Sequence, residues 1–152
     1  MENLSDVQAS PQYAFVRGDI CDRSLVDGLM GSAKFDVVVD FAAESHMDRS
    51  ILDAGPFIEA NVKGTQVLLE AARSRGIGLF VQVSTAEVYG SLGPNDPPFS
   101  EESPLVPSRP YAASKAAGDP LVKVSHTTLG LPVIITRCSN NDGPYQFPEK
   151  LN

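Results

Sequence analysis

Tyr111 and Lys115 are the two side chains in this sequence whose types and spacing best suit acid–base chemistry. They stand four residues apart in a segment with a helical pattern, so both project from one face of the helix. A lysine ammonium beside a tyrosine stabilises the phenolate and lowers the pKa of the phenol. Such a tyrosine can take the proton of a hydroxyl group while a hydride leaves the same carbon. The spacing alone is weak evidence, because many helices place Tyr and Lys this way by chance.

Two further polar residues follow a predicted strand over residues 79–84. The carboxyl ends of parallel strands are where open α/β sheets bind ligands. Thr85 could therefore hydrogen-bond the hydroxyl on which Tyr111 acts. Glu87 stands just past the strand end, where a carboxylate could take a proton from a carbon next to a ketone. A solvated glutamate without a role is an equal alternative at this position.

The segment 41–50 (FAAESHMDRS) follows another predicted strand. Small residues at the carboxyl end of a strand let a flat cofactor ring lie close to the backbone. Phe41, Ala42 and Ala43 would form that wall, and Ser45 would then face the pocket. An ordinary polar loop between a strand and a helix is the competing interpretation.

Weaker candidates lie near both ends of the chain. Asp19 and Ile20 could meet the adenine end of a cofactor, or they form a simple turn. Asn140 carries an amide that suits hydroxyl-rich ligands, and Lys150 suits a phosphate, although the segment also reads as a Gly/Pro loop. His46 invites a metal hypothesis, but no paired histidine or acid spacing supports it, and we expect no metal site.

Composition excludes several classes of function. Of the 152 residues 42% are apolar, which is enough for a core, and the formal net charge of −7 argues against binding to nucleic acid. No apolar stretch approaches the ~20 residues that cross a bilayer. The first residues (MENLSDVQASPQ) are polar and do not resemble a secretory signal. The two cysteines have no metal-binding spacing, and a cytoplasmic location is the expectation.

The elements that must position these residues alternate between strand and helix. Residues 35–43 are almost all apolar and β-branched, which predicts a strand buried on both faces. Asp22 or Ser24 could cap the first helix, and Gly76 stands where a helix would end. The pattern predicts strands at 13–16, 35–43, 79–84 and 132–138, helices at 22–30, 56–75 and 111–129, and a long loop at 91–110.

This alternation favours an α/β fold with a doubly wound parallel sheet of Rossmann-like type, treated as one domain over 1–152. Four strands are too few to close a barrel. A dinucleotide-binding sheet normally opens with a strand, a glycine-rich loop and a helix, whose N-terminus holds the pyrophosphate. No such loop occurs here. We therefore expect an incomplete sheet that lacks the first βαβ unit.

Taken together, these segments resemble the dTDP-glucose 4,6-dehydratase family of the extended short-chain dehydrogenases. The resemblance runs from about residue 3 to residue 151 and rests on FVRGDICD, FAAESHMDRSI, STAEVYG, PYAASKAAGD and CSNNDGPYQFPEKL. It implies an NAD-dependent lyase of nucleotide-sugar metabolism that converts dTDP-glucose into its 4-keto-6-deoxy form. Full members are roughly twice as long and have a C-terminal substrate domain that we expect to be absent here.

The resemblance also assigns roles to residues. It makes Tyr111 the base for oxidation at C4 with Lys115 as its helper, Thr85 the group that orients the sugar, and Glu87 the base at C5. It implies a homodimer through the helices 56–75 and 111–129. The implied NAD-side residues are Asp19, Ile20, Phe41, Ala42, Ala43, Ser45, Tyr111 and Lys115, and the implied substrate contacts are Ser45, Thr85, Asn140 and Lys150.

Departures from the family pattern concern the site and its supporting helix. Ala86 stands where the family has the aspartic acid that protonates the leaving hydroxyl, so elimination should slow by about 10²–10⁴-fold. Asp142 replaces an aromatic residue. Pro120 falls inside the helix of Tyr111, where it should cost about 3 kcal/mol or kink the helix. Gly118 should cost about 1 kcal/mol more.

These departures leave several functions open. The chain could be an impaired dehydratase, or a related nucleotide-sugar epimerase or decarboxylase, which needs no acid at position 86. It could also be a non-catalytic structural remnant or a dimerising module. Without the glycine-rich loop and the substrate domain, we expect the chain on its own not to catalyse the reaction and doubt that it binds NAD.

Overall fold

The computed structural model describes residues 4–141, 143, 144 and 146, which fall into two compact units. One unit comprises residues 19–139 and contains the sheet and its helices. The other comprises 1–18 and 140–152. In the latter, residues 4–10 form successive turns, such as the bond from the amide of Gln8 to the carbonyl of Leu4 (2.9 Å). Tyr13–Val16 is not a strand, so that prediction was wrong.

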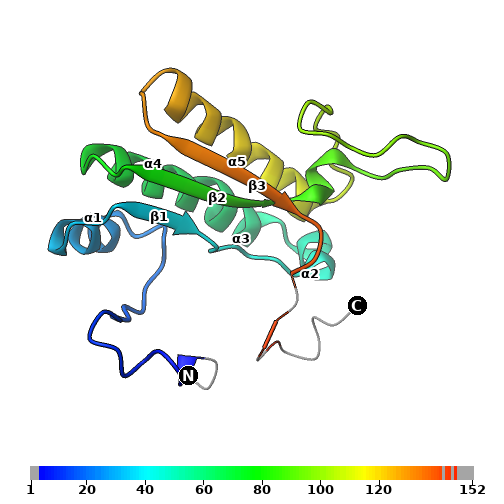
Figure 1. Ribbon diagram of the computed structural model, residues 1–152. Coiled ribbons are helices and arrows are strands. Elements are labelled where there is room, and N and C mark those ends of the chain that lie inside the picture. The colour runs from blue at the N-terminus through cyan, green and yellow to red at the C-terminus, as the bar shows by residue number, and fades with distance from the viewer. Residues whose placement is uncertain (1–3, 142, 145, 147–152) are drawn as a thin grey trace. The chain divides into compact units, whose positions relative to one another are not determined.

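The larger unit is built on three parallel strands in the order β1-β2-β3 (Figure 1). These are β1 (Val37–Asp40), β2 (Leu79–Thr85) and β3 (Val133–Cys138). Asp40 is in register with Gln82, and Thr85 with Cys138, so all three strands end at the same edge. The parallel α/β sheet is confirmed, with three strands where four were expected.

The helices lie between the strands in sequence, as predicted. α1 (Arg23–Ser32) begins after Asp22, whose carboxylate accepts a hydrogen bond from the amide of Leu25, which confirms the predicted cap. Residues 55–74 form an unbroken helical run of three elements, close to the predicted 56–75. Its end at Gly76 has φ +65°, the left-handed conformation that glycine adopts without strain. The remaining helices are α2 (Met47–Leu52), α3 (Gly55–Ile58), the π-helix η2 (Glu59–Gly64), α4 (Thr65–Ser74), the 3₁₀ turn η3 (Ala86–Tyr89) and α5 (Pro110–Thr127).

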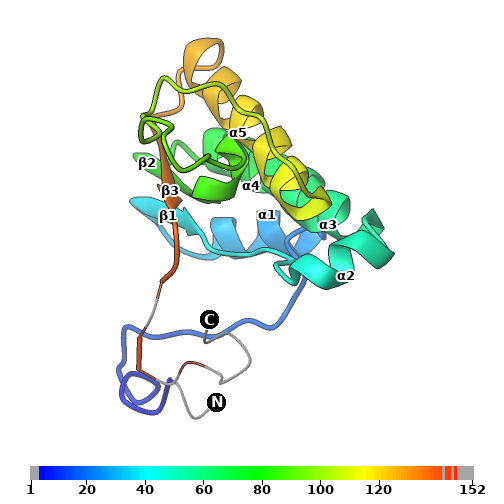
Figure 2. The same cartoon turned by 90° about the vertical axis from the view of Figure 1, so that its right-hand side faces the viewer.

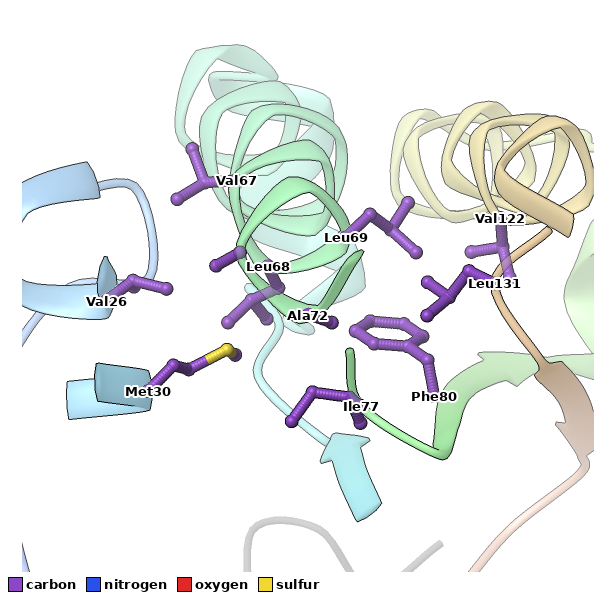
Figure 3. Close-up of a cluster of buried hydrophobic side chains, with 11 residues drawn as sticks. Val26, Met30, Val67, Leu68, Leu69, Ala72, Ile77, Phe80, Val122 and Leu131 are labelled. Carbon is purple, nitrogen blue, oxygen red and sulfur yellow. The ribbon is translucent and has the colours of Figure 1, made fainter. Parts of the chain in front are cut away.

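Helices cover one face of the sheet, and this face holds the core (Figure 2). Phe80 on β2 is fully buried, and its ring lies beside Ala72 of α4 and Leu131 (Figure 3). The opposite face is open: Val37 and Val39 on β1 are each 47% exposed. The expectation that strand 35–43 is buried on both faces was therefore wrong, because among the described residues helices pack only on one side. The core cluster comprises Val26, Met30, Val67, Leu68, Leu69, Ala71, Ala72, Ile77, Phe80, Val122 and Leu131.

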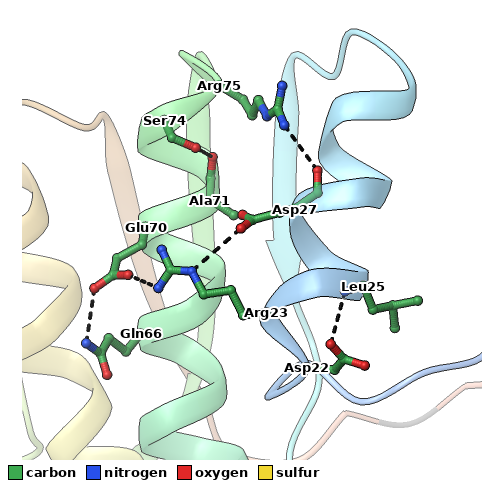
Figure 4. Close-up of polar contacts among 9 residues, drawn as sticks. All are labelled: Asp22, Arg23, Leu25, Asp27, Gln66, Glu70, Ala71, Ser74 and Arg75. Atoms are coloured by element: carbon green, nitrogen blue, oxygen red, sulfur yellow. Dashed lines mark hydrogen bonds and ion pairs between the residues drawn. The ribbon is translucent and has the colours of Figure 1, made fainter.

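Polar contacts join α1 to α4 around the rim of this core (Figure 4). The guanidinium of Arg23 pairs with Glu70 on α4 and with Asp27 one turn along its own helix. Arg75 reaches back from the end of α4 to the carbonyl of Asp27 (3.3 Å). Because these groups are largely exposed, they orient α1 more than they stabilise it.

α5 carries Tyr111 and Lys115, and it continues without a break past Pro120 to Thr127. Pro120 lies on the exposed side of the helix. Gly118 lies on the buried side, where an added Cβ would stand 2.8 Å from the carbonyl oxygen of Asn61. The glycine thus permits α5 to lie close against η2, and the helical turn that bears Tyr111 and Lys115 is intact.

Candidate active site

Thr85, Glu87 and Tyr111 come together at the carboxyl end of β2. Thr85 is the last residue of β2 and accepts a hydrogen bond from the amide of Glu87 (3.3 Å), which starts the turn η3. Tyr111 lies in the first turn of α5, half-buried, with its ring edge against Phe57 (6.4 Å between centroids). A hydrogen bond between the Thr85 hydroxyl and Tyr111 slightly opposes the effects of burial and of Glu87, which raise the pKa of the phenol.

The net pKa of Tyr111 is nevertheless raised above its ordinary value. Burial is the first cause, and the negative charge of Glu87 is the second, since both disfavour a phenolate. We expected Lys115 to lower this pKa. Its ammonium instead interacts with the carboxylates of Asp40 and Asp119, and in this structure it does not offset the burial of Tyr111.

Lys115 lies one helical turn after Tyr111 and is almost wholly buried, at 3% exposed. Burial lowers the pKa of this lysine, and the charges of Asp40 and then Asp119 raise it. Asp40 closes β1 and Asp119 follows Lys115 by one turn, so the ammonium has acidic neighbours on two elements. Sequence reasoning missed both residues, although an acidic residue at the end of an otherwise apolar strand was a visible signal for Asp40.

An asparagine that sequence reasoning also missed fixes the loop after β1. The side chain of Asn61, in η2, accepts from the amide of Glu44 (3.1 Å) and donates to its carbonyl (3.1 Å). The same amide nitrogen donates a hydrogen bond to the hydroxyl of Ser114 (2.9 Å). That hydroxyl in turn donates a hydrogen bond to the backbone carbonyl of Tyr111 (2.7 Å). Asn61 thereby ties the loop of Ser45 to the first turns of α5.

The predicted cofactor wall lies at the same edge of the sheet. Phe41, Ala42 and Ala43 are exposed directly after β1, with Phe41 at 74%. Ser45 is half-buried before α2. The hydroxyl of Ser84, which precedes Thr85 at the end of β2, is buried and has no partner among the described residues. The short side chains of Ala42, Ala43 and Ser45, the exposed ring of Phe41 and the unpartnered hydroxyl of Ser84 fit a flat, polar ligand at this edge.

The remaining predicted site residues lie before α1 or after β3 in the sequence. Ile20 packs partly against the core and lies so close to Gly64 that any added Cβ there would overlap it. The carboxylate of Asp19 accepts a hydrogen bond from the amide of Cys21 (2.8 Å), which forms a turn, and its contact with a cofactor stays a prediction. Asn140 is exposed and belongs to the smaller unit, and Lys150 lies outside the described residues.

The family model described as GDP-mannose 4,6 dehydratase matches residues 1–151. The chain belongs to this family. A dTDP-glucose 4,6-dehydratase from Actinoplanes is 53% identical to it over 151 residues, which are 99% of this chain and 46% of the relative. Another from Streptomyces antibioticus is 56% identical over 148 residues, 97% of this chain and 43% of the relative. This dehydratase-family chain thus spans less than half the length of these relatives.

Solved structures agree with this assignment. One such structure is a dTDP-glucose 4,6-dehydratase from Streptomyces venezuelae, solved as a double mutant with NAD bound. It is 51% identical to the present chain, with a TM-score of 0.91, and the match covers 99% of the present chain and 45% of the Streptomyces chain. A UDP-glucose 4-epimerase from Thermus thermophilus, solved with NAD, is 32% identical with a TM-score of 0.82. That match covers 87% of the present chain and 42% of the epimerase. The resemblance stated from the motifs is confirmed.

Among the described residues, no helix is both long enough and apolar enough to span a bilayer.

Proposed function

We propose that this chain supplies the catalytic side of an NAD-dependent 4,6-dehydratase that acts on a nucleotide-linked hexose, with dTDP-glucose as the substrate. The observation that carries the proposal is the meeting of Thr85, Glu87 and Tyr111 at the end of β2, one turn from the buried Lys115. The match to dehydratases of known name supports the substrate class.

The residues divide the chemistry as follows. Tyr111 takes the proton of the C4 hydroxyl, which Thr85 orients, while the C4 hydrogen departs as hydride. Because the pKa of this phenol is raised in the ligand-free chain, Tyr111 must lose its own proton before it acts as the base. Glu87 then takes the C5 proton, which the new 4-keto group has acidified, and the C6 hydroxyl leaves as water once it gains a proton. Glu87 gives its proton back to C5 as C6 is reduced, which completes the 4-keto-6-deoxy sugar. NAD, if bound, would supply the hydride chemistry at C4 and C6. The exposed wall of Phe41, Ala42 and Ala43 and the hydroxyl of Ser45 would hold it.

Ala86 marks the weak step of this scheme. It is the first residue of η3, between Thr85 and Glu87, and a methyl group cannot protonate the leaving hydroxyl. The elimination therefore needs a proton from water. Ala86 also gives the one specific reason for a second candidate, a nucleotide-sugar 4-epimerase, because epimerisation oxidises and reduces C4 without expelling water. The likeness to the Thermus epimerase structure is compatible with it.

A segment exchange separates the two candidates. Residues 1–151 replace the matching segment of the Streptomyces venezuelae dehydratase, and the hybrid is made with Ala86, Ala86→Asp and Ala86→Asn. If the chain is a dehydratase, the aspartate raises the rate of 4-keto-6-deoxy product by about 10²–10⁴-fold and the isosteric asparagine does not. Equal product from the aspartate and asparagine hybrids would contradict a missing acid. A 4-epimer formed by the alanine hybrid would establish the epimerase.

The homodimer is likewise a proposal. Helices of the run 56–75 and of 111–129 each leave an aliphatic side chain half exposed, Ile58 at 49% and Val124 at 53%. Sedimentation of the chain with Ile58→Lys or Val124→Lys, against the unsubstituted chain, tests it. A dimer that neither lysine weakens would rule out this surface.

A further inference from the structure

The turn η3 carries Glu87, the C5 base of the proposed function, yet it is only four residues long. A single turn of this kind forms too few hydrogen bonds of its own to be stable without support. The hydroxyl of Thr85 begins it, and the amide of Gly90 closes it by donating to the carbonyl of Glu87 (3.1 Å). Both bonds lie within residues 85–90, so contacts with other elements must set how the turn is oriented.

The side chain of Tyr89, two residues after Glu87, supplies such contacts. It is 8% exposed, and its hydroxyl accepts a hydrogen bond from the Nη1 of Arg137 on β3 (2.7 Å). The guanidinium carbon of Arg137 also lies 5.1 Å from the centre of the tyrosine ring, within the range of a cation–π interaction. Phe99, in the loop after η3, stacks on the same ring with centroids 5.1 Å apart. Tyr89 is therefore held both from the sheet and from the loop.

The backbone on either side of Tyr89 is fixed as well. The carbonyl of Val88 accepts a hydrogen bond from the amide of Val106, where the long loop returns to the turn (2.9 Å). Gly90 has φ +93°, and a Cβ added to it would stand 2.5 Å from the carbonyl oxygen of Val106. The turn therefore cannot move toward the loop, and the bond from Arg137 to Tyr89 ties it to β3.

Arg137 holds the turn and α5 with different nitrogen atoms. Its Nε donates to Asp119 on α5 (2.9 Å), whereas its Nη1 donates to Tyr89. The hydroxyl of Tyr89 can therefore be removed while the bond to the helix of Tyr111 stays in place. This division makes it possible to disturb Glu87 without disturbing Tyr111.

We infer that Tyr89 is a positioning residue of the candidate active site, whose side chain, held by Arg137 and Phe99, fixes the turn that presents Glu87 to the sugar. The inference rests on the proposed function for the role of Glu87 at C5. The hold of Tyr89 on the turn does not depend on that function. Because Tyr111 acts from α5 and Glu87 from η3, loss of the Tyr89 hydroxyl should slow the elimination and spare the oxidation at C4.

Amide hydrogen exchange of the 152-residue chain without ligand tests the hold on the turn. Tyr89→Phe keeps the ring and removes only its hydroxyl. The amides of Gly90 and Val106 should then exchange at least about tenfold faster, since a hydrogen bond to a charged group contributes at least that factor. The amide of Ala113, which bonds the carbonyl of Arg109 at the start of α5 (2.8 Å), should keep its rate. Tyr13→Phe, in the smaller unit, is the matched control and should change none of these rates.

A second variant covers the case in which Tyr89→Phe does not fold. Phe99→Leu removes the stacked ring on the loop side and should speed exchange of the same two amides, Gly90 and Val106. Unchanged exchange of both amides in the folded variants overturns the inference. So does faster exchange that includes Ala113 to the same degree, because the effect would then not be confined to the turn.

The segment-exchange hybrid with Ala86→Asp tests the consequence for the reaction. Tyr89→Phe in this hybrid should lower the rate of 4-keto-6-deoxy product about 10–10²-fold, as expected for a displaced catalytic group, and leave single-turnover NADH formation within about twofold. A merely structural role would slow both steps alike, and that result, or no change in either, contradicts the inference. A hybrid with Tyr89 that forms no NADH would contradict the proposed function instead, and the exchange rates would still decide whether Tyr89 holds the turn.

Discussion

The Nε of Arg137 on β3 donates to the Oδ2 of Asp119 on α5 at 2.9 Å, and Asp119 is fully buried. The same guanidinium donates to the hydroxyl of Tyr89 (2.7 Å) and lies over its ring. One cation thus joins the helix of Tyr111 and Lys115 to the sheet and to the turn that carries Glu87. Loss of this pair should loosen the whole candidate site.

Asp119→Asn tests that joint. It leaves the guanidinium, only 11% exposed, without a counter-charge, and breaking a buried pair in this way costs about 3–5 kcal/mol. We expect denaturant unfolding to show a loss of that size. Asp27→Asn is the control, since Asp27 forms a comparable pair with Arg23 at the surface. If the two variants lose equal stability, the buried pair is not the joint described here.

Gly118→Ala should destabilise the chain although alanine favours helices. The new Cβ would stand 2.8 Å from the carbonyl oxygen of Asn61, so α5 and η2 must move apart. Gly28→Ala in α1 is the matched control, because nothing lies within 4 Å of its added Cβ. We expect this control to gain up to about 1 kcal/mol from helix propensity. Thermal unfolding that ranks the two variants the other way would contradict the close approach.

Pro120→Ala should stabilise the chain. Proline cannot donate a hydrogen bond within a helix, and its ring crowds the preceding turn, so an interior position costs about 3 kcal/mol. α5 is continuous through Pro120, so the proline does not provide a bend that the fold uses, and its cost is not offset. Pro110→Ala is the control, because a proline at the first position of a helix loses no bond. Equal melting temperatures for the two variants would show that the helix accommodates Pro120 without cost.

Glu87→Gln should lower the pKa of Tyr111. The glutamate charge is the second cause of the raised pKa, after burial. In the unsubstituted chain the folded phenol ionises above its ordinary value of 10.0, so its contribution to stability is full below pH 10 and is lost as pH rises through the folded pKa. The difference between the ultraviolet titrations of the chain with and without Tyr111→Phe isolates this phenolate from those of the other three tyrosines. Glu101→Gln, in the exposed loop, should leave the pKa of Tyr111 unchanged. If Glu87→Gln also left that pKa unchanged, the charge of Glu87 would not act on the phenol.

The sequence predicted those features that depend on neighbouring residues. Asp22 as a helix cap, Gly76 as a helix end and the common helical face of Tyr111 and Lys115 follow from local geometry, and the structure has all three. Thr85 and Glu87 could be placed because parallel strands end at one edge. The motif segments also pointed correctly to the family.

Features that depend on contacts between distant segments could not be predicted. The cost assigned to Gly118 was taken from helix propensity, whereas its position against Asn61 requires the absence of a Cβ. The effect of Lys115 on Tyr111 was taken from spacing, whereas the charges of Asp40 and Asp119 decide how the ammonium acts. Likewise, the apolar composition of strand 35–43 does not reveal on which face helices pack.

The most direct measurement of the central claim is single-turnover formation of NADH by the segment-exchange hybrid, made with Tyr111 and with Tyr111→Phe. If Tyr111 takes the C4 hydroxyl proton, the phenylalanine hybrid should form NADH about 10²–10⁴-fold more slowly while binding the sugar nucleotide as before. Tyr13→Phe, outside the sheet-bearing unit, should leave the rate unchanged. Equal NADH formation by the tyrosine hybrid and the phenylalanine hybrid would contradict the account.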